Sequence, residues 1–286
     1  MLNLSQKTIN KSISCNSIGL HSGCNVNMTL KPAPINSGIT FIRTDLPQGT
    51  NEIKAQFSNV TTTNLGTTIA NQHGATISTI EHLMAGIWGC GIDNLIIEID
   101  NVEAPIMDGS SEPFVFLIEC AGICLQSENR RVIEITEKIS FHDGDKFIEA
   151  LPAKEFAINL KINFNHPQIQ INELSYHSSS HSFKNDLCRA RTFCFKNEIE
   201  HMHKLGLAKG GSLDNAIVVD DDKILNEGNL RYKDEFIRHK TLDFIGDLFL
   251  AGHYIIAHFN ANKVGHTLNN KFLHHLFNNP QSWRLV

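Results

Sequence analysis

Three polar residues on one predicted helix, His239, Asp243 and Asp247, could together carry out metal or acid-base chemistry. They lie in residues 232–253, where apolar residues recur at helical spacing and no proline interrupts the pattern, so we expect a long, largely buried helix. Residues four apart project from the same face, so the imidazole of His239 and the carboxylate of Asp243 can converge on one point. Such a pair is half of a metal site, a surface ion pair, or a core histidine with a local partner. Asp247 favours the metal site, because it extends the same line and buried carboxylates are uncommon unless paired or metal-bound.

A second predicted helix, at residues 78–88, carries the adjacent pair Glu81 and His82 among apolar residues. Ser78 and Glu81 match the capping box S-x-x-E, in which the glutamate bonds back to the first backbone amide of the helix. His82 has no comparable local role. If His82 joins the histidine and the first aspartate of the other helix, three protein ligands leave a fourth position for water, as catalytic zinc requires. Glu81 would then stand beside that water, where a general base belongs.

His266 differs from the other histidines in its surroundings. It lies in the short polar segment 260–267, between an apolar run and a predicted helix, and scaffolded loops of this kind often carry acid-base residues. His201, His203, His274 and His275 lie in polar segments and are expected to be surface residues, and His253 has no partner at a recognisable spacing.

The length of 286 residues exceeds what one hydrophobic core usually supports, so two domains are expected. We place them at residues 1–127 and 128–286, with a polar linker at 122–129 and a small insertion near 190–212. Residues 91–100 and 212–221 echo each other, since both have an Asp-Asn pair, a β-rich run and a closing aspartate. The echo suggests two domains of similar topology.

Composition excludes several classes of protein. The net charge of -5 without a cluster of Lys or Arg argues against a nucleic-acid partner. No apolar run approaches the roughly 18 residues of a membrane span, and the N-terminal residues lack the apolar core of a signal peptide, so we expect a cytoplasmic protein. The seven cysteines have no zinc-finger spacing and are expected to be reduced and buried.

Six motifs are spread along the chain: GLHSG at 19–23, STIEH at 78–82, PIMDGS at 105–110, RARTF at 189–193, the run 238–252, and Gly265-His266. With these motifs the chain resembles the UDP-3-O-acyl-N-acetylglucosamine deacetylases, the zinc enzymes of lipid A synthesis, over nearly its whole length. The resemblance implies an α+β fold of two domains, each packing helices against a β-sheet, with the active site at their interface. It also implies a small-molecule substrate, an acylated UDP-sugar, and we expect a monomer.

The resemblance further implies a role for each site residue. The zinc ligands would be His82, His239 and Asp243, the base Glu81, the acid His266 held by Asp247, and the oxyanion donor Thr192. The sugar-nucleotide side of the substrate would be lined by Phe193, Lys240, Lys146, Asn163 and Phe164, and Asn163 stands where relatives carry Asp. An apolar set, Phe195, Ile199 and Ala208, would line a passage for the 3-O-acyl chain, although packing of a small insertion explains that set equally well.

The expected reaction is hydrolysis of the N-acetyl group with release of acetate. A zinc amidohydrolase acting on another substrate is the alternative among enzymes, and a binding protein with structural zinc is the alternative outside them. An open coordination position with Glu81 beside a ligand favours catalysis, because structural zinc sites are closed by four protein ligands.

Overall fold

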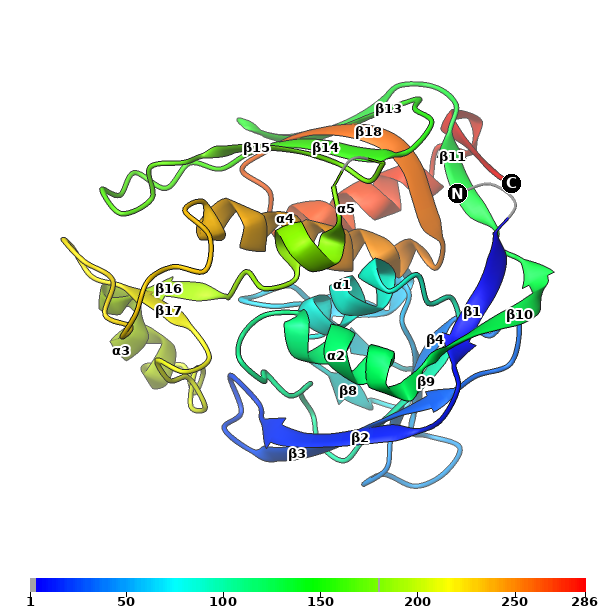
Figure 1. Ribbon diagram of the computed structural model, residues 1–286, viewed down its shortest axis with the longest axis horizontal. Helices are drawn as coiled ribbons and strands as arrows, with labels where there is room; N and C mark the ends of the chain where they lie inside the picture. The colour runs from blue at the N-terminus through cyan, green and yellow to red at the C-terminus, as the bar shows by residue number, and fades with distance from the viewer. Residues whose placement is uncertain (1–3, 180) are drawn as a thin grey trace.

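Two helices, α1 (Glu81–Gly89) and α4 (Glu235–Leu248), pack against each other at the centre of the molecule (Figure 1). The computed structural model describes residues 4–179 and 181–286. Residues 81–88 of α1 are all buried, and in α4 only Arg238 and Lys240 are not. A helix that is apolar around most of its circumference belongs in a protein interior, so the few polar side chains on this pair face one another or a cavity.

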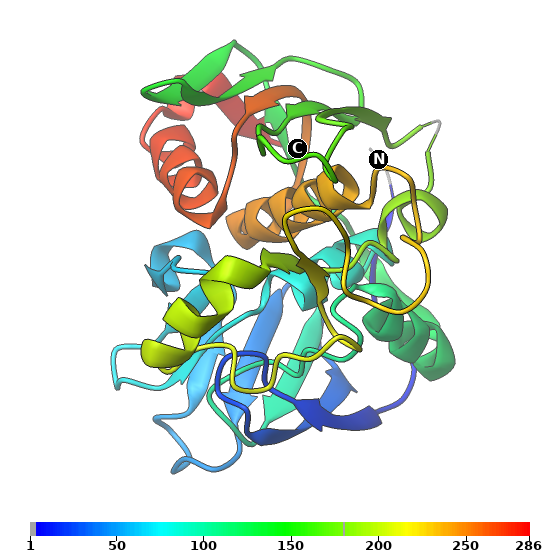
Figure 2. The same cartoon turned by 90° about the vertical axis from the view of Figure 1, so that its left-hand side faces the viewer.

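A β-sheet covers each side of the helix pair, and α2 (Glu112–Ala121) and α5 (His266–Phe277) lie in the same central layer beside α1 and α4 (Figures 1 and 2). The first sheet has the order β2 (Ile13–Ile18), β3 (Asn25–Pro32), β9 (Leu95–Ile99), β4 (Ile39–Arg43) and β5 (Glu52–Lys54). The second contains β12 (Ile139–Asp143), β13 (Lys146–Leu151), β18 (Tyr254–Asn262), β14 (Phe156–Lys161) and β15 (Glu173–His177), and β11 (Val132–Ile135) and β19 (Trp283–Leu285) extend it.

The two sheets share one topology. The central strand β9 pairs antiparallel with β3 and parallel with β4, and the central strand β18 pairs in the same way with β13 and β14. Each central strand follows one helix of the central pair and precedes a flanking helix. The expected α+β fold, with two domains of like topology that each pack helices against a sheet, is therefore confirmed, although the residue numbers of the division remain a prediction.

The sequence echo pointed to the wrong strand for this repeat. Residues 212–221 contain β17 (Ile217–Val219), which pairs with β16 (Phe193–Phe195) in a small two-stranded sheet beside α3 (Lys196–Lys204). The counterpart of β9 is β18 instead. An Asp-Asn turn followed by β-branched residues specifies a strand, but it does not specify which sheet the strand joins.

Other local expectations also need correction. The predicted linker is wrong, because residues 123–129 form β10 (Ile123–Asn129), which pairs antiparallel with β1 (Ser5–Ile9). The first helix begins at Glu81 rather than Ser78, since the hairpin of β7 (Thr68–Ala70) and β8 (Thr76–Ile77) runs up to it. β6 (Val60–Thr62) completes that small sheet. All seven cysteines, which lie within the described residues, are free thiols, but only Cys90 and Cys188 are buried as expected. Three are partly buried (Cys15, Cys124 and Cys194), and Cys24 and Cys120 are exposed.

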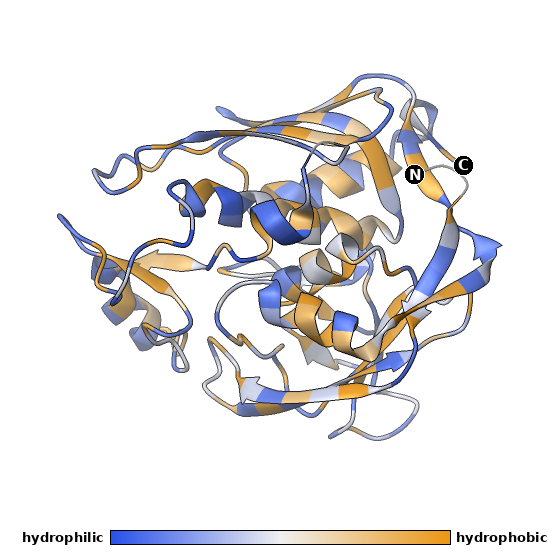
Figure 3. Cartoon of the chain, in the orientation of Figure 1, coloured by the Kyte–Doolittle hydropathy of each residue, from blue (hydrophilic) through white to orange (hydrophobic). Residues whose placement is uncertain are grey.

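Hydrophobic residues gather where sheets and helices face each other, for example on β18 and α2 (Figure 3). Within residues 4–179 and 181–286, no helix has both the length and the hydrophobicity that a membrane crossing needs.

The crossing of α1 and α4 depends on Gly246. A Cβ atom at this position would lie 2.1 Å from the backbone oxygen of Glu81 and 3.2 Å from the backbone nitrogen of Ala85. Both neighbours are backbone atoms of a packed helix and cannot turn aside. The glycine therefore sets how closely the helix carrying Glu81 and His82 approaches the helix carrying His239.

Gly246→Ala is expected to force α1 and α4 apart and to lower the free energy of unfolding by about 2 kcal/mol or more, in the range of overpacked cores. Chemical denaturation monitored by circular dichroism measures the loss. The same variant should bind metal more weakly, because its ligands come from both helices. Wild-type stability in Gly246→Ala would show that the helix pair can relax around a methyl group.

Candidate active site

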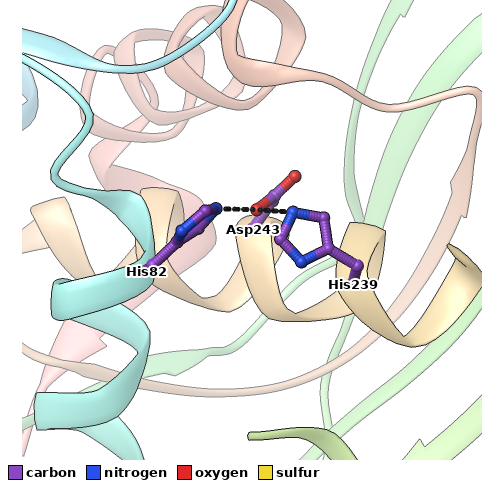
Figure 4. Close-up of side chains that lie close together, drawn as sticks. All are labelled: His82, His239 and Asp243. Atoms are coloured by element: carbon purple, nitrogen blue, oxygen red, sulfur yellow. Dashed lines mark ion pairs between the residues drawn. The ribbon is translucent and has the colours of Figure 1, made fainter. Parts of the chain in front are cut away.

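Three side chains predicted as metal ligands meet at the α1–α4 crossing, His82 from α1 and His239 and Asp243 from α4 (Figure 4). The Nε2 atoms of His82 and His239 lie 3.5 and 3.3 Å from Oδ1 of Asp243. One ligand atom from each residue fits within 4.8 Å of the others, and all three residues are buried. This spacing is compatible with a single ion bound at the centre of the group.

The surroundings of the triad fit a metal ion. Oδ1 of Asp243 is buried and has no hydrogen-bond partner within the described part of the chain, which is costly for a carboxylate oxygen unless a cation binds it. Oδ2 of Asp243 accepts a hydrogen bond of 2.7 Å from Nζ of Lys240. Nδ1 of His239 lies 3.0 Å from the backbone oxygen of Ala190, so it donates there and leaves Nε2 as the ligand atom.

Both residues on α4 are held in the protonation state that binds metals. Burial lowers the pKa of His239 to about 3, so its imidazole is neutral. Burial opposes ionisation of Asp243, but the adjacent Lys240 ammonium favours the carboxylate, and the pKa of that carboxyl lies well below its usual range. Neutral imidazole and ionised carboxylate are the metal-binding forms of these side chains.

Glu81 lies beside the triad, and the predicted capping box is wrong. The residue before α1 is Ile80, and no side chain caps the helix. Oε2 of Glu81 instead accepts a 2.9 Å hydrogen bond from the backbone N–H of Thr67, and Oε1 lies 3.8 Å from Nε2 of His266. Burial raises the pKa of the Glu81 carboxyl, which makes it a better proton acceptor when ionised.

His266, the first residue of α5, forms a pair with Asp247. Its Nδ1 lies 2.8 Å from Oδ2 of Asp247, so Nε2 points toward Glu81. Burial would lower the pKa of His266, but the carboxylates of Asp247 and Glu81 raise it to about 9. A protonated imidazole facing a carboxylate across a few ångströms is an arrangement suited to paired acid and base chemistry.

A cavity of about 510 Å³ opens onto these groups. Most of the predicted substrate contacts line it, and so do the proposed acid, base and metal-binding residues: Glu81, His82, Lys146, Phe164, Thr192, Phe193, Phe195, His239, Lys240, Asp243 and His266. Asp247 lies behind His266, away from the cavity wall. Asn163 does not line the cavity either, although its neighbour Phe164 in the same connection after β14 does.

An apolar cavity of about 350 Å³ adjoins the first, and Thr192 and Phe193 line both. Ile199 and Ala208 belong to its wall, together with Met202, Val218 and Leu225. Phe195, predicted in the same set, faces the first cavity instead. The insertion therefore forms an apolar space next to the polar site.

The motif at residues 189–193 is anchored at three points around α4. Ala190 accepts the hydrogen bond from His239, and the backbone N–H and Nε of Arg191 donate to Oε1 of the buried Glu235 at 3.0 and 2.9 Å. The N–H of Thr192 donates to the backbone oxygen of Gly109 at 2.8 Å. These contacts fix the backbone at Thr192, a residue that lines both cavities.

Residues 6–278 match the family described as LpxC: UDP-3-O-acyl N-acetylglycosamine deacetylase. The chain belongs to this family. Among named relatives, the UDP-3-O-acyl-N-acetylglucosamine deacetylase of Mannheimia succiniciproducens is 47% identical over 285 residues, covering 99% of this chain and 93% of the relative. The deacetylases of Shewanella halifaxensis and Tolumonas auensis are each 45% identical, and each match covers 98% of this chain and 92% of the relative.

Two polar residues around the site of this LpxC family member were not found by sequence reasoning. Nδ2 of Asn269 donates to Oδ2 of Asp247 at 2.7 Å, and the hydroxyl of Thr67 donates to Oδ1 at 2.5 Å. Asn269 stands three residues after His266 on α5, so helical spacing could have indicated it. Thr67 is brought in by the β7–β8 hairpin and gives no local signal.

Proposed function

We propose that the protein hydrolyses the N-acetyl group of UDP-3-O-(3-hydroxyacyl)-N-acetylglucosamine and releases acetate, the committed step of lipid A biosynthesis. The observation that carries the proposal is the convergence of Glu81, His266 and a metal-ligand triad on one cavity that adjoins an apolar one. We also propose zinc as the metal, since two histidines and one carboxylate with an open position are a catalytic zinc set. A bound zinc ion would polarise the amide carbonyl and make a water molecule acidic enough to react at neutral pH.

The residues of the chain then divide the proton transfers between them. Glu81 accepts a proton from the attacking water, and His266 protonates the departing amine, which is a poor leaving group otherwise. The Thr192 hydroxyl donates a hydrogen bond to the oxyanion of the tetrahedral intermediate. Lys240 and Lys146 place positive charge where the diphosphate of the substrate lies, while Phe193 and Phe164 pack against its sugar-nucleotide part. Asn163 has the weakest support among these contacts, because it does not line the cavity.

The test is release of acetate from the acylated UDP-sugar by the purified protein, with and without a chelator. Activity that disappears on chelation and returns with zinc supports both the substrate and the metal. A zinc-loaded protein that releases no acetate from this substrate, but hydrolyses another acylated amide, would identify a different amidohydrolase. A protein that binds zinc and hydrolyses neither would be a binding protein. A cytoplasmic location and a monomeric state belong to the same proposal, and cell fractionation and light scattering test them.

The acyl chain of the substrate is expected to occupy the apolar cavity beside Ile199 and Ala208. Each methylene group removed from water contributes about 0.8 kcal/mol, so a substrate without the chain should lose at least about a hundredfold in kcat/KM. Steady-state kinetics on the acylated and deacylated substrates measure the difference. Ile199→Trp, which narrows the cavity, should impair only the acylated substrate. Equal kcat/KM values for the two substrates would mean that the cavity is only a packing feature of the insertion.

A further inference from the structure

Thr67 occupies an unusual place between the two halves of the site. It is 2% exposed and directly precedes β7, whose pairing with β8 sets Ile69 opposite Ile77. Continued by two residues, this antiparallel register brings Thr67 opposite Thr79, just before α1 begins. The backbone N–H of Ile80 donates to the backbone oxygen of Thr67 at 3.4 Å. The hairpin thus holds Thr67 against the N-terminus of the helix that carries Glu81.

From this place Thr67 makes two hydrogen bonds with different partners. Its backbone N–H donates to Oε2 of Glu81 at 2.9 Å, and its hydroxyl donates to Oδ1 of Asp247 at 2.5 Å. Glu81 belongs to α1 and Asp247 to α4, so one residue connects both central helices through their carboxylates. Both bonds are buried. Hydrogen bonds to ionised groups in such surroundings are short and roughly twice as strong as neutral ones.

The hydroxyl of Thr67 completes the set of donors around Asp247. Oδ2 of this carboxylate accepts from Nδ1 of His266 and Nδ2 of Asn269, which leaves Oδ1 for Thr67. Three donors thus hold both oxygens of this carboxylate in place. The carboxylate in turn accepts from Nδ1 of His266 and so aims Nε2 at Glu81. Asn269 supports the same carboxylate, but within the described residues no hydrogen bond joins it to Glu81.

The other charged groups near His266 do not substitute for this contact. Glu81 faces it from α1 and Lys240 from α4, while Asp143, Lys146 and Lys263 line the same cavity. Glu81 is the proposed base and changes protonation during the reaction. Lys240 disfavours the imidazolium.

We propose that Thr67 is a positioning residue for the reaction, holding Glu81 through its amide and the Asp247–His266 pair through its hydroxyl. This inference rests on the proposed function for the roles of Glu81 and His266. A purely structural role, in which Thr67 fills space beside the helices, is the alternative that an experiment must separate.

Thr67→Val removes the hydroxyl while keeping the shape of the side chain and the amide bond to Glu81. We expect it to retain zinc, to change KM less than about twofold, and to lower kcat at least about tenfold, as loss of an oriented acid should. The basic limb of the pH profile should move up by about one unit, because the Asp247 carboxylate loses a donor that offsets its charge and then holds the imidazolium more firmly. Thr67→Ser keeps the hydroxyl, so its kcat and the position of its basic limb should match those of the wild-type protein.

Thr241→Val is the matched control. Thr241 is a fully buried threonine on α4 whose hydroxyl donates to the backbone oxygen of Ile237, one turn away. Its valine variant loses a buried hydroxyl in the same helix pair and should leave the basic limb in place. A Thr67→Val enzyme with the wild-type limb and kcat, or a Thr67→Ser enzyme as impaired as Thr67→Val, would overturn the proposal.

Titration of His266 by nuclear magnetic resonance, with histidine labelled selectively, tests the same contact without substrate. The midpoint for His266 should be about one unit higher in Thr67→Val than in the wild-type protein and in Thr67→Ser. An unchanged midpoint would reject the positioning role whatever reaction the protein catalyses, and a shifted midpoint in a protein that releases no acetate would reject only the proposed function. If Thr67→Val does not fold, Thr67→Cys, which keeps a weak donor of similar size, is measured in the same way.

Discussion

His239→Ala is expected to lose most of its bound zinc, with a metal affinity at least about a hundredfold lower than that of the wild-type protein. The substitution removes Nε2, one of three atoms that meet at the centre of the triad, and it also frees the backbone oxygen of Ala190. Two remaining ligands do not define a tetrahedral zinc site. Metal content per protein molecule, measured after dialysis at equal free zinc, gives the result, and activity should fall with it.

His82→Ala and Asp243→Ala should behave in the same way, because each contributes one ligand atom. The matched controls are His203→Ala and His253→Ala. His203 is exposed on α3, and His253 lies beyond the end of α4 at a different cavity, so both variants should keep full zinc. Stoichiometric zinc in His239→Ala would remove this residue from the ligand set. Loss of zinc in the controls would show that metal content follows general stability instead.

Glu81→Ala and His266→Ala are expected to keep zinc and to lose at least about a hundredfold in kcat, the usual contribution of a positioned acid or base. The two should differ in their pH dependence. Activity requires ionised Glu81 and protonated His266, so the wild-type profile of kcat/KM should be bell-shaped. Its basic limb should follow His266, whose pKa is raised to about 9, and should be absent from His266→Ala.

Asp247→Ala tests whether a neighbouring carboxylate raises the pKa of His266 and so sets the basic limb. Asp247 is the nearest carboxylate to His266 and favours the imidazolium, so its removal lowers the pKa of His266. With a lower pKa the His266 imidazolium loses its proton at a lower pH, so the basic limb should move to lower pH. If His266→Ala keeps near-full activity and an unchanged basic limb, another group must be the general acid. Glu81, acting as a proton shuttle, is then the next candidate. Because the attacking water can also titrate, the variants rather than the wild-type profile assign the limbs.

Helical spacing explains why part of the site was predictable. His239, Asp243 and Asp247 follow one another at intervals of four on a helix with little other polar surface, and such a pattern survives in any fold that buries the helix. The partners of Glu81 were not predictable in this way. Its local match to a capping box was misleading, because the carboxylate is satisfied by Thr67, which a hairpin brings from outside the helix.

Strand pairing and the substrate-binding residues were likewise predictable only where local sequence patterns determine them. The alternating patterns indicated most strands, but the pairing of β10 with β1 and the position of β17 outside the large sheets depend on distant partners. Lys146 lies on β13 and reaches the cavity as expected, whereas Asn163 follows the end of β14, where no periodicity fixes the direction of a side chain.

The close contact of α1 and α4 at Gly246 has a consequence for how the protein matures. The metal-binding atoms come from two helices that are far apart in the chain and that meet closely at Gly246. The half that contains α4 carries only His239 and Asp243, so neither half synthesised alone can assemble the triad. Zinc retention therefore reports completion of the whole fold, and two separately expressed halves should acquire it only after they associate.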